Sequence, residues 1–272
     1  MEKIKDALDK AKKIQSSSRN IKGQNIISSD NRNYLDLENI NYTKTKKVKV
    51  SEELLRNKRI LIGDVKDEIS DEYKVLRTQV IQLMNKNNWS TLAISGPKEG
   101  CGKTLTSINL CISIARDVNQ SVLLVDLDLR RPNIHNYFFT QEVLGISDYL
   151  VNKKNLDEIL FNPGIERLVV LPGNKSIQNS SEMLSSPQVV QLVNELKNKY
   201  SNRLVIFDMP PLLSCDDMLA FTPYVDAFML VVEDGVTLKQ DLKRSVELLD
   251  TNKLLGIVLN KSKDSVGINQ YY

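Results

Sequence analysis

Six short apolar runs, separated by stretches with helical periodicity, constrain the fold of this 272-residue chain more than any other feature. The runs are Thr91–Ser95, Ser121–Asp126, Arg167–Pro172, Arg203–Asp208, Asp226–Val232 and Leu254–Asn260. Most of their residues are apolar without alternation, which is typical of parallel strands covered by helices on both faces. Helices are expected between the runs at Lys103–Arg116, Ser186–Tyr200 and Leu238–Leu249. The sequence therefore predicts a doubly wound α/β domain with a mainly parallel sheet.

Composition excludes several other classes of protein. Apolar residues make up 41% of the chain, which is too many for a globally disordered protein. No apolar run approaches the ~18 residues of a membrane-spanning helix, and the charged N-terminus lacks a signal-peptide core. Three cysteines without a CxxC pair and a single histidine exclude a zinc site and a histidine-based triad. We expect a cytoplasmic protein with free thiols.

Positive charge is concentrated near the N-terminus. Residues 1–50 contain 12 Lys and Arg against 6 Asp and Glu, a net charge of +6, although the whole chain carries only +3. A short helix is predicted over residues 2–14, with an apolar stripe formed by Ile4, Ala7, Leu8, Ala11 and Ile14. This segment is interpreted as a solvated tail, or as a docking element for an acidic protein partner or a membrane surface. Aromatic and basic residues are not interleaved, so we expect no nucleic-acid partner.

The chain is expected to divide into three parts. Residues 1–61 form a basic N-terminal helix and a flexible spacer, with a short helix near Glu52–Arg59. Residues 62–264 form the α/β domain, which opens with an amphipathic helix over 69–84, and residues 265–272 form a tail. On that helix Asp71, Lys74 and Arg77 lie three residues apart on a face that is free to meet solvent or another subunit.

The first apolar run leads directly into the segment Ser95–Thr104, SGPKEGCGKT, which a helix follows. Glycines in such a loop let backbone N–H groups turn toward phosphates, and the helix N-terminus adds a positive dipole. Lys103 is expected to neutralise the β- and γ-phosphate oxygens, and the Thr104 hydroxyl is expected to bind Mg²⁺. Pro97 replaces the first glycine of the strict GxxxxGK[ST] pattern, but the strand–loop–helix context still predicts a phosphate-binding loop.

Carboxylates follow two later runs. Asp126 and Asp128 are two residues apart at the end of one run, where both project into the crevice that binds ligands in open α/β sheets. Both could bind the metal, or one the metal and the other a substrate hydroxyl. Asp208 ends the apolar run Arg203–Asp208 and matches a Walker B carboxylate, which reaches Mg²⁺. Together these elements predict a Mg-ATP or Mg-GTP site.

The segment Asp126–Pro132, DLDLRRP, resembles a second Walker motif of the A′ type, and it is followed downstream by Asp-Met-Pro-Pro at 208–211. With Glu182–Ser186 before a helix and an acidic residue at Asp217, residues 62–263 resemble the bacterial tyrosine kinase (CpsD/CapB) family. The N-terminal helix, the spacer, and Val258–Lys261 followed by Tyr271 and Tyr272 are similar to exosortase-associated tyrosine autokinases. That family belongs to the wider MinD/ParA-like group of P-loop ATPases, so the resemblance implies a deviant Walker P-loop fold.

The resemblance also implies roles for individual residues. Lys103, Asp126 and Asp128 would be catalytic, with Asp126 as the base for the tyrosine hydroxyl. Thr104, Asp128 and Asp208 would hold Mg²⁺. The nucleotide-binding set would be Lys98, Gly100, Cys101, Gly102, Lys103, Thr104, Leu105 and Asn260, with Asn260 near adenine. Arg130 would steady phosphate or remain solvated.

The implied activity is that of an ATP- and Mg²⁺-dependent tyrosine autokinase that phosphorylates Tyr271 and Tyr272 of a neighbouring copy. The implied partners are further copies of the chain and a membrane-bound regulator of polysaccharide chain length, which would recruit the protein to the inner face of the membrane and regulate exopolysaccharide or capsule export.

Three features depart from the family pattern, the first being a tyrosine-rich tail that is reduced to Tyr271 and Tyr272. The oligomerisation motif Glu-x-x-Arg-x-x-Arg is present only as Asp71-x-x-Lys74-x-x-Arg77, which keeps the charges but has fewer bidentate donors. Lys98 lies five residues before Lys103, where MinD/ParA ATPases carry a lysine that reaches the neighbouring subunit's nucleotide. The alternatives to a kinase are therefore a MinD/ParA-like positioning ATPase and a nucleotide-binding scaffold with negligible turnover.

Overall fold

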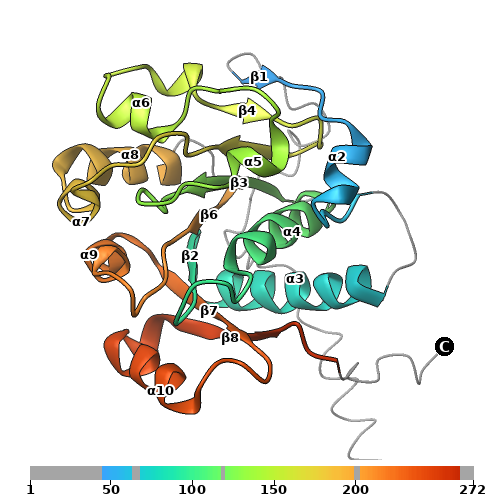
Figure 1. Cartoon of the computed structure of the whole chain (residues 1–272), viewed down its shortest axis with the longest axis vertical. Coiled ribbons are helices and arrows are strands. Elements are labelled where there is room, and N and C mark those ends of the chain that lie inside the picture. Colours follow the sequence, from blue (N-terminus) through green and yellow to red (C-terminus); the bar gives the residue numbers. More distant parts are fainter. Residues whose placement is uncertain (1–44, 63–67, 118–119, 199–202, 264–272) are drawn as a thin grey trace, which may run out of the picture. The chain divides into compact units, whose positions relative to one another are not determined.

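The computed structural model describes residues 45–62, 68–117, 120–198 and 203–263 (Figure 1). The helix expected over residues 2–14, most of the spacer, and Tyr271 and Tyr272 lie outside the described residues. The described residues form an eight-stranded sheet with helices on both faces, so the predicted doubly wound α/β fold is confirmed.

The strand order of the sheet is β1-β4-β5-β3-β6-β2-β7-β8. The strands are β1 (Lys46–Lys47), β2 (Thr91–Ser95), β3 (Ser121–Asp126), β4 (Phe161–Asn162), β5 (Leu168–Leu171), β6 (Arg203–Asp208), β7 (Ala227–Glu233) and β8 (Leu254–Asn260). All neighbouring pairs are parallel except β4 with β5. The six predicted strands agree with the structure to within one residue. The two-residue strands β1 and β4 were not predicted, because they are too short to produce a pattern.

Helices α2 (Glu52–Asn57), α3 (Glu68–Lys86), α4 (Lys103–Ala115) and α5 (His135–Phe138) pack on one face of the sheet. The helices of the other face are α6 (Ile146–Leu150), α7 (Ser180–Leu184), α8 (Pro187–Asn198), α9 (Asp217–Phe221) and α10 (Lys239–Leu248). Short 3₁₀ turns at Leu156–Glu158, Thr222–Tyr224 and Thr251–Lys253 complete the connections.

Successive strand residues supply the two cores alternately. In β3, Val122 and Leu124 join the core under α4, whereas Leu123 and Val125 join the core under α8. Each of these four side chains is fully buried. Side chains of a strand point to opposite faces in turn, so a strand that is covered on both faces has to be apolar throughout. This requirement explains the unbroken apolar runs in the sequence.

The segment that precedes residue 62 is part of this packing. Leu55 and Ile60 are only 4% and 3% exposed and belong to the same core as α4. The backbone N–H of Leu61 donates to Asn109 Oδ1 at 3.0 Å, and Arg116 donates to the Leu61 carbonyl at 3.1 Å. The short helix expected near Glu52–Arg59 is present as α2, but residues 45–61 pack on the core instead of forming a flexible spacer. The apolar residues of this segment are too few and too scattered to reveal a core contribution from sequence.

Helix α3 also differs in part from expectation. Asp71 and Lys74 are exposed and form an ion pair of 2.7 Å on the helix surface. Arg77, in contrast, turns toward α4 and donates to the Ser113 carbonyl at 3.1 Å. The three charged residues therefore do not present one free face within this chain.

Candidate active site

The phosphate-binding loop lies between the end of β2 and the start of α4. Gly100 and Gly102 adopt φ angles of 84° and 91°, which are unfavourable for residues with a side chain. A Cβ atom at Gly102 would clash with Asn260 Nδ2, so a side chain here would also displace the Asn260 amide. The loop is supported from the segment that follows β6, because the Ser95 hydroxyl donates to the Pro210 carbonyl at 2.6 Å. The predicted strand–loop–helix arrangement is present.

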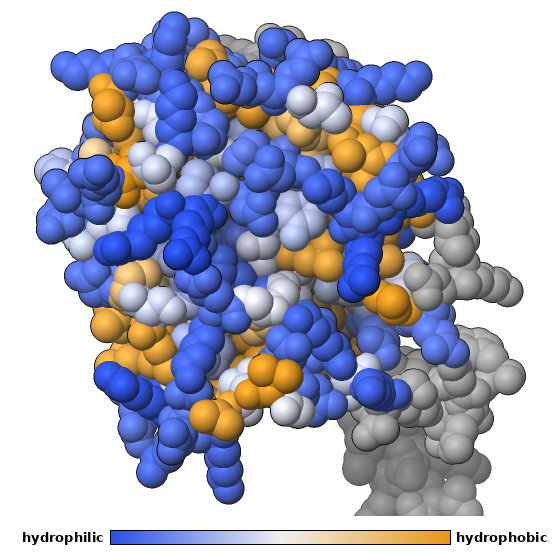
Figure 2. Space-filling model, in the orientation of Figure 1, coloured by the Kyte–Doolittle hydropathy of each residue, from blue (hydrophilic) through white to orange (hydrophobic). Residues whose placement is uncertain are grey.

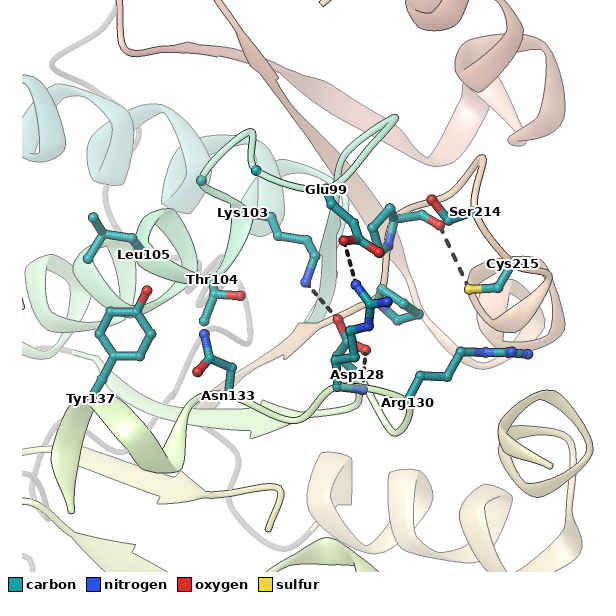
Figure 3. A pocket seen from close by; sticks show the side chains of 15 residues that line it. Glu99, Lys103, Thr104, Leu105, Asp128, Arg130, Asn133, Tyr137, Ser214 and Cys215 are labelled. Atoms are coloured by element: carbon teal, nitrogen blue, oxygen red, sulfur yellow. Dashed lines mark hydrogen bonds and ion pairs between the residues drawn. The ribbon is translucent and has the colours of Figure 1, made fainter. Parts of the chain in front are cut away.

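Lys103 points from the first turn of α4 toward the loop after β3 (Figure 3). Its Nζ lies 2.9 Å from Asp128 Oδ2, and both side chains are largely buried. Burial by itself would lower the pKa of the ammonium, but the carboxylates of Asp208 and Asp128 outweigh it and raise that pKa. Lys103 is therefore a fixed positive charge in the site.

Asp208, at the end of β6, is joined to two hydroxyls of α4. Thr104 Oγ1 donates to Asp208 Oδ2 at 2.7 Å, and Ser107 Oγ donates to Oδ1 at 3.0 Å. Burial raises the pKa of Asp208, opposed chiefly by the charge of Lys103. Sequence reasoning found Thr104 but not Ser107. The spacing of three residues on one helix could have indicated that both face the same carboxylate.

Asp126 is fully buried and is not among the residues that line the cavity beside Lys103. Its Oδ2 accepts hydrogen bonds of 2.9 Å from the backbone N–H groups of both Asn133 and Ile134. Burial, and then the charge of Asp208, raise the pKa of this carboxyl to about 7. In this structure Asp126 closes the turn that carries Asp128, and Gly173 leaves the space that its carboxylate occupies.

The site opens into a cavity of about 480 Å³. Lys103 and Thr104 of α4 and Asp128 of the loop after β3 line it, with the Lys103 side chain pointing toward Asp128 (Figure 3). Pro210 and Pro211, which follow Asp208, form an apolar part of its wall. Glu99 of the loop and Arg131 are joined by an ion pair of 2.5 Å at its rim. The prolines and this rim pair were not assigned from sequence, where they have no pattern that distinguishes them from structural residues.

A second cavity, of about 650 Å³, adjoins the loop at Gly102 and Leu105. Asn260 lines it and donates to the Cys101 carbonyl at 2.8 Å, and residues 59–62 form another part of its wall. Lys98 is placed elsewhere, since its Nζ pairs with Asp241 of α10 at 2.6 Å and its side chain is 60% exposed. The predicted loop residues and Asn260 therefore come together, whereas Lys98 lies outside both cavities.

The donor set fits Mg²⁺ bound together with phosphates. Within the described ranges no group of three or more His, Cys, Asp or Glu residues could hold a metal ion alone. Mg²⁺ typically uses one or two carboxylates with substrate phosphates and water, and here the Thr104 hydroxyl donates to Asp208 while Asp128 lines the same cavity as Thr104. The chemistry of the residues present thus suits a Mg-nucleotide rather than a resident metal centre.

The surface of the molecule is predominantly hydrophilic on the face that Figure 2 shows, with small separate apolar areas. Among the helices that the structure describes, none has the length and apolar character to cross a bilayer.

The parallel sheet, the glycine-bearing loop before α4 and the lysine between carboxylates define a P-loop nucleotide-binding protein of the deviant Walker class. A family described as an AAA domain matches residues 89–234. The tyrosine-protein kinase YwqD of Bacillus subtilis (strain 168) is 30% identical over 206 residues, which is 75% of this chain and 86% of YwqD.

Solved structures agree with this assignment. The chimerical protein CapA2B2 has a TM-score of 0.68 at 26% identity, covering 80% of this chain and 94% of that one. The septum site-determining protein MinD of Pyrococcus horikoshii OT3, complexed with Mg-ADP, has a TM-score of 0.53 at 22% identity, covering 64% and 72%, a likeness of fold alone. This chain belongs to the bacterial tyrosine-kinase family.

Proposed function

We propose that this protein is an ATP- and Mg²⁺-dependent tyrosine autokinase that phosphorylates Tyr271 and Tyr272 of a neighbouring copy. The observation that carries the proposal is the joint placement of Lys103, Asp128 and Asp208 at the phosphate-binding loop, in a chain similar to YwqD. Phosphoryl transfer needs positioning and charge stabilisation more than covalent chemistry, and these three residues supply both.

The nucleotide has room in the two adjoining cavities. The loop N–H groups and the start of α4 would bind the phosphates, and Asn260 with residues 59–62 would enclose the nucleoside. Lys103, now paired with Asp128, would turn to the β- and γ-phosphates. Mg²⁺, held by Thr104, Asp128 and Asp208, would neutralise charge that develops on the transferring group.

Two carboxylates are candidates for taking the proton of the acceptor hydroxyl. Asp126 has a pKa of about 7, which suits a general base at neutral pH, but it faces the cavity only if the turn at Asn133 and Ile134 moves. Asp128 lines the cavity directly but is also a metal ligand in this proposal. We propose Asp126 as the base, so Asp126→Asn should retain ATP binding and lose transfer to tyrosine.

Mass spectrometry of the purified protein after incubation with ATP and Mg²⁺ tests the proposal. We expect phosphate on Tyr271 and Tyr272, and loss of most phosphotyrosine when both are changed to Phe, while slow ATP hydrolysis continues. Mixing a Lys103→Ala chain with a Tyr271→Phe/Tyr272→Phe chain tests transfer between copies, since phosphotyrosine can then form only in trans. Absence of phosphotyrosine in the unmodified protein would contradict the proposal.

The remaining parts of the proposal concern partners. Residues 1–50, with a net charge of +6, would dock on the cytoplasmic end of a membrane-bound regulator of polysaccharide chain length, and homo-oligomers would bring tails to neighbouring sites. Deleting residues 1–44 should leave ATP binding unchanged and reduce membrane recruitment in cells. Unchanged localisation would refute the docking role.

A MinD/ParA-like positioning ATPase is the second candidate, favoured by Lys98. This candidate requires Lys98 to reach the nucleotide of a partner subunit. In this structure the Lys98 ammonium pairs with Asp241 of its own chain, which is an arrangement that such a function would have to break.

A further inference from the structure

Arg130 forms an ion pair on the side of the cavity away from Lys103. Its Nε and Nη2 lie 3.1 and 3.0 Å from the same oxygen, Asp217 Oδ1. Figure 3 shows the Arg130 side chain extending away from Lys103, toward the segment that carries Cys215. Asp216, the next residue, is 69% exposed and only approaches the guanidinium at 3.7 Å. The guanidinium thus pairs with a carboxylate of its own chain, a contact that the sequence did not predict.

The buried carboxylate of Asp217 depends on the Arg130 guanidinium for charge compensation. Its side chain is fully buried, and its Oδ2 has no hydrogen-bond partner among the described residues. A folded protein is strongly destabilised when a buried carboxylate loses its counter-ion. The pair therefore holds the two segments that it joins at a fixed separation. Those segments are the loop after β3, which presents Asp128, and the start of α9.

The segment between Asp208 and Asp217 is held at its other end as well. The N–H groups of Leu212 and Leu213 donate to the carbonyls of Gly96 and Pro97 in the phosphate-binding loop, at 2.9 and 3.1 Å. This segment contributes four residues to the wall of the cavity: Pro210, Pro211, Ser214 and Cys215. One end is therefore tied to the nucleotide side of the site, and the other is tied to Arg130.

We infer that Arg130 and Asp217 are positioning residues for the acceptor: their pair sets the separation between the Asp128 loop and the Pro210–Cys215 wall, where the tyrosine ring enters. The inference rests on the proposed kinase function. The phosphate-binding loop and Lys103 occupy the nucleotide side, which leaves the space between these two segments for the acceptor. The adjoining prolines offer a rigid apolar surface against which an aromatic ring can pack.

The test compares three quantities in the full chain: affinity for ATP, release of inorganic phosphate, and formation of phosphotyrosine. In Arg130→Lys and Asp217→Asn we expect ATP affinity within about twofold of the unmodified protein. Phosphotyrosine formed per ATP hydrolysed should fall by about tenfold or more, because a displaced reactant can cost up to ~100-fold in rate. With a peptide of residues 262–272 as acceptor, the loss should appear mainly in the KM for the peptide.

Matched controls are available within the chain. Asp216→Asn changes the adjacent exposed carboxylate, and Arg244→Ala removes an exposed arginine of α10; neither should alter the ratio. If a single variant does not fold, Arg130→Ala/Asp217→Ala decides the question, since it leaves no unpaired buried carboxylate and should show the same reduced ratio.

Three outcomes overturn the inference. An unchanged ratio in folded variants, beside normal phosphotyrosine formation by the unmodified protein, overturns it alone. If ATP hydrolysis and phosphotyrosine formation fall equally, and both follow the loss of thermal stability in the variants, the pair has a purely structural role. Absence of phosphotyrosine in the unmodified protein overturns the inference together with the proposed function.

Discussion

Two aspartates at opposite ends of the same sheet, Asp126 and Asp226, have opposite electrostatic environments. Asp226 precedes β7 and accepts hydrogen bonds from the backbone N–H groups of Ser90 and Thr91 at 2.9 and 3.1 Å. Its other oxygen pairs with Lys197. Burial opposes ionisation of Asp226, but these contacts outweigh it, led by Lys197, and lower its pKa. Asp126, at the carboxyl end of β3, has instead a raised pKa.

The difference lies in the neighbouring charges. Asp226 has its own cation, whereas Asp126, Asp128 and Asp208 meet at one edge of the sheet, where Lys103 is the cation that pairs with them among the described residues. Like charges gathered in a buried site destabilise the fold until a ligand supplies positive charge. The amino ends of the strands are thus arranged for stability, and the carboxyl ends retain an excess of negative charge that a bound Mg²⁺ would offset.

Lys103→Ala should produce the largest effect, because it removes the ammonium from the carboxyl end. A water-poor site loses several kcal/mol of charge stabilisation, so ATP turnover should fall by about 1,000-fold or more. Phosphate release and phosphotyrosine formation are the measurements, and circular dichroism should show a retained fold. Turnover like that of the unmodified protein would contradict the whole nucleotide-site interpretation.

Asp126→Asn tests the destabilising charge directly. A carboxyl with a pKa of 3.8 when unfolded and about 7 when folded contributes stability that is fully present below pH 4 and is lost as pH rises toward 7. The variant should lack this slope, and between pH 5 and 8 its stability relative to the unmodified protein should rise by on the order of 3 kcal/mol. Urea unfolding without nucleotide measures it, and parallel curves for both proteins would argue against the raised pKa.

Asp226→Ala should give the opposite result at the other end of the sheet. The N–H groups of Ser90 and Thr91 lose their acceptor, and at pH 7 the free energy of unfolding should fall by about 2 kcal/mol. Because the pKa is lowered from 3.8, this contribution is present above pH 4 and disappears as pH falls through the folded-state value. ATP turnover per folded molecule should not change. A loss of turnover at full stability would mean that the two ends are coupled.

Lys98→Ala should produce the smallest effect. Its ammonium is exposed and pairs with Asp241, so the expected loss of stability is below about 1 kcal/mol. A kinase should keep its rate of phosphotyrosine formation within about twofold. Loss of hydrolysis in this variant, with no phosphotyrosine in the unmodified protein, would instead favour the positioning ATPase.

Sequence alone predicted two kinds of element: strands that must be apolar because both faces are buried, and the loop whose backbone needs glycine. β2, β3 and β6 are buried on both faces, so their composition reveals them, and the loop at Gly100–Thr104 requires a fixed order of residues. The pairing of Arg130 with Asp217 was not predicted, since 87 residues separate the two. Likewise, Asp126 matches its family motif, but only the fold shows that its Oδ2 accepts hydrogen bonds from the turn at Asn133 and Ile134.

The position of β2 has a consequence for how the chain acquires its structure during synthesis. This strand pairs on one side with residues 205–208 and on the other with residues 227–230, more than 100 positions further along the chain. Contacts between such distant segments require closure of long loops, which slows folding. A growing chain therefore exposes the apolar residues of β2 until most of the domain has left the ribosome. A ligand that contacts both Thr104 and Asp208 can therefore bind only after these distant segments have come together.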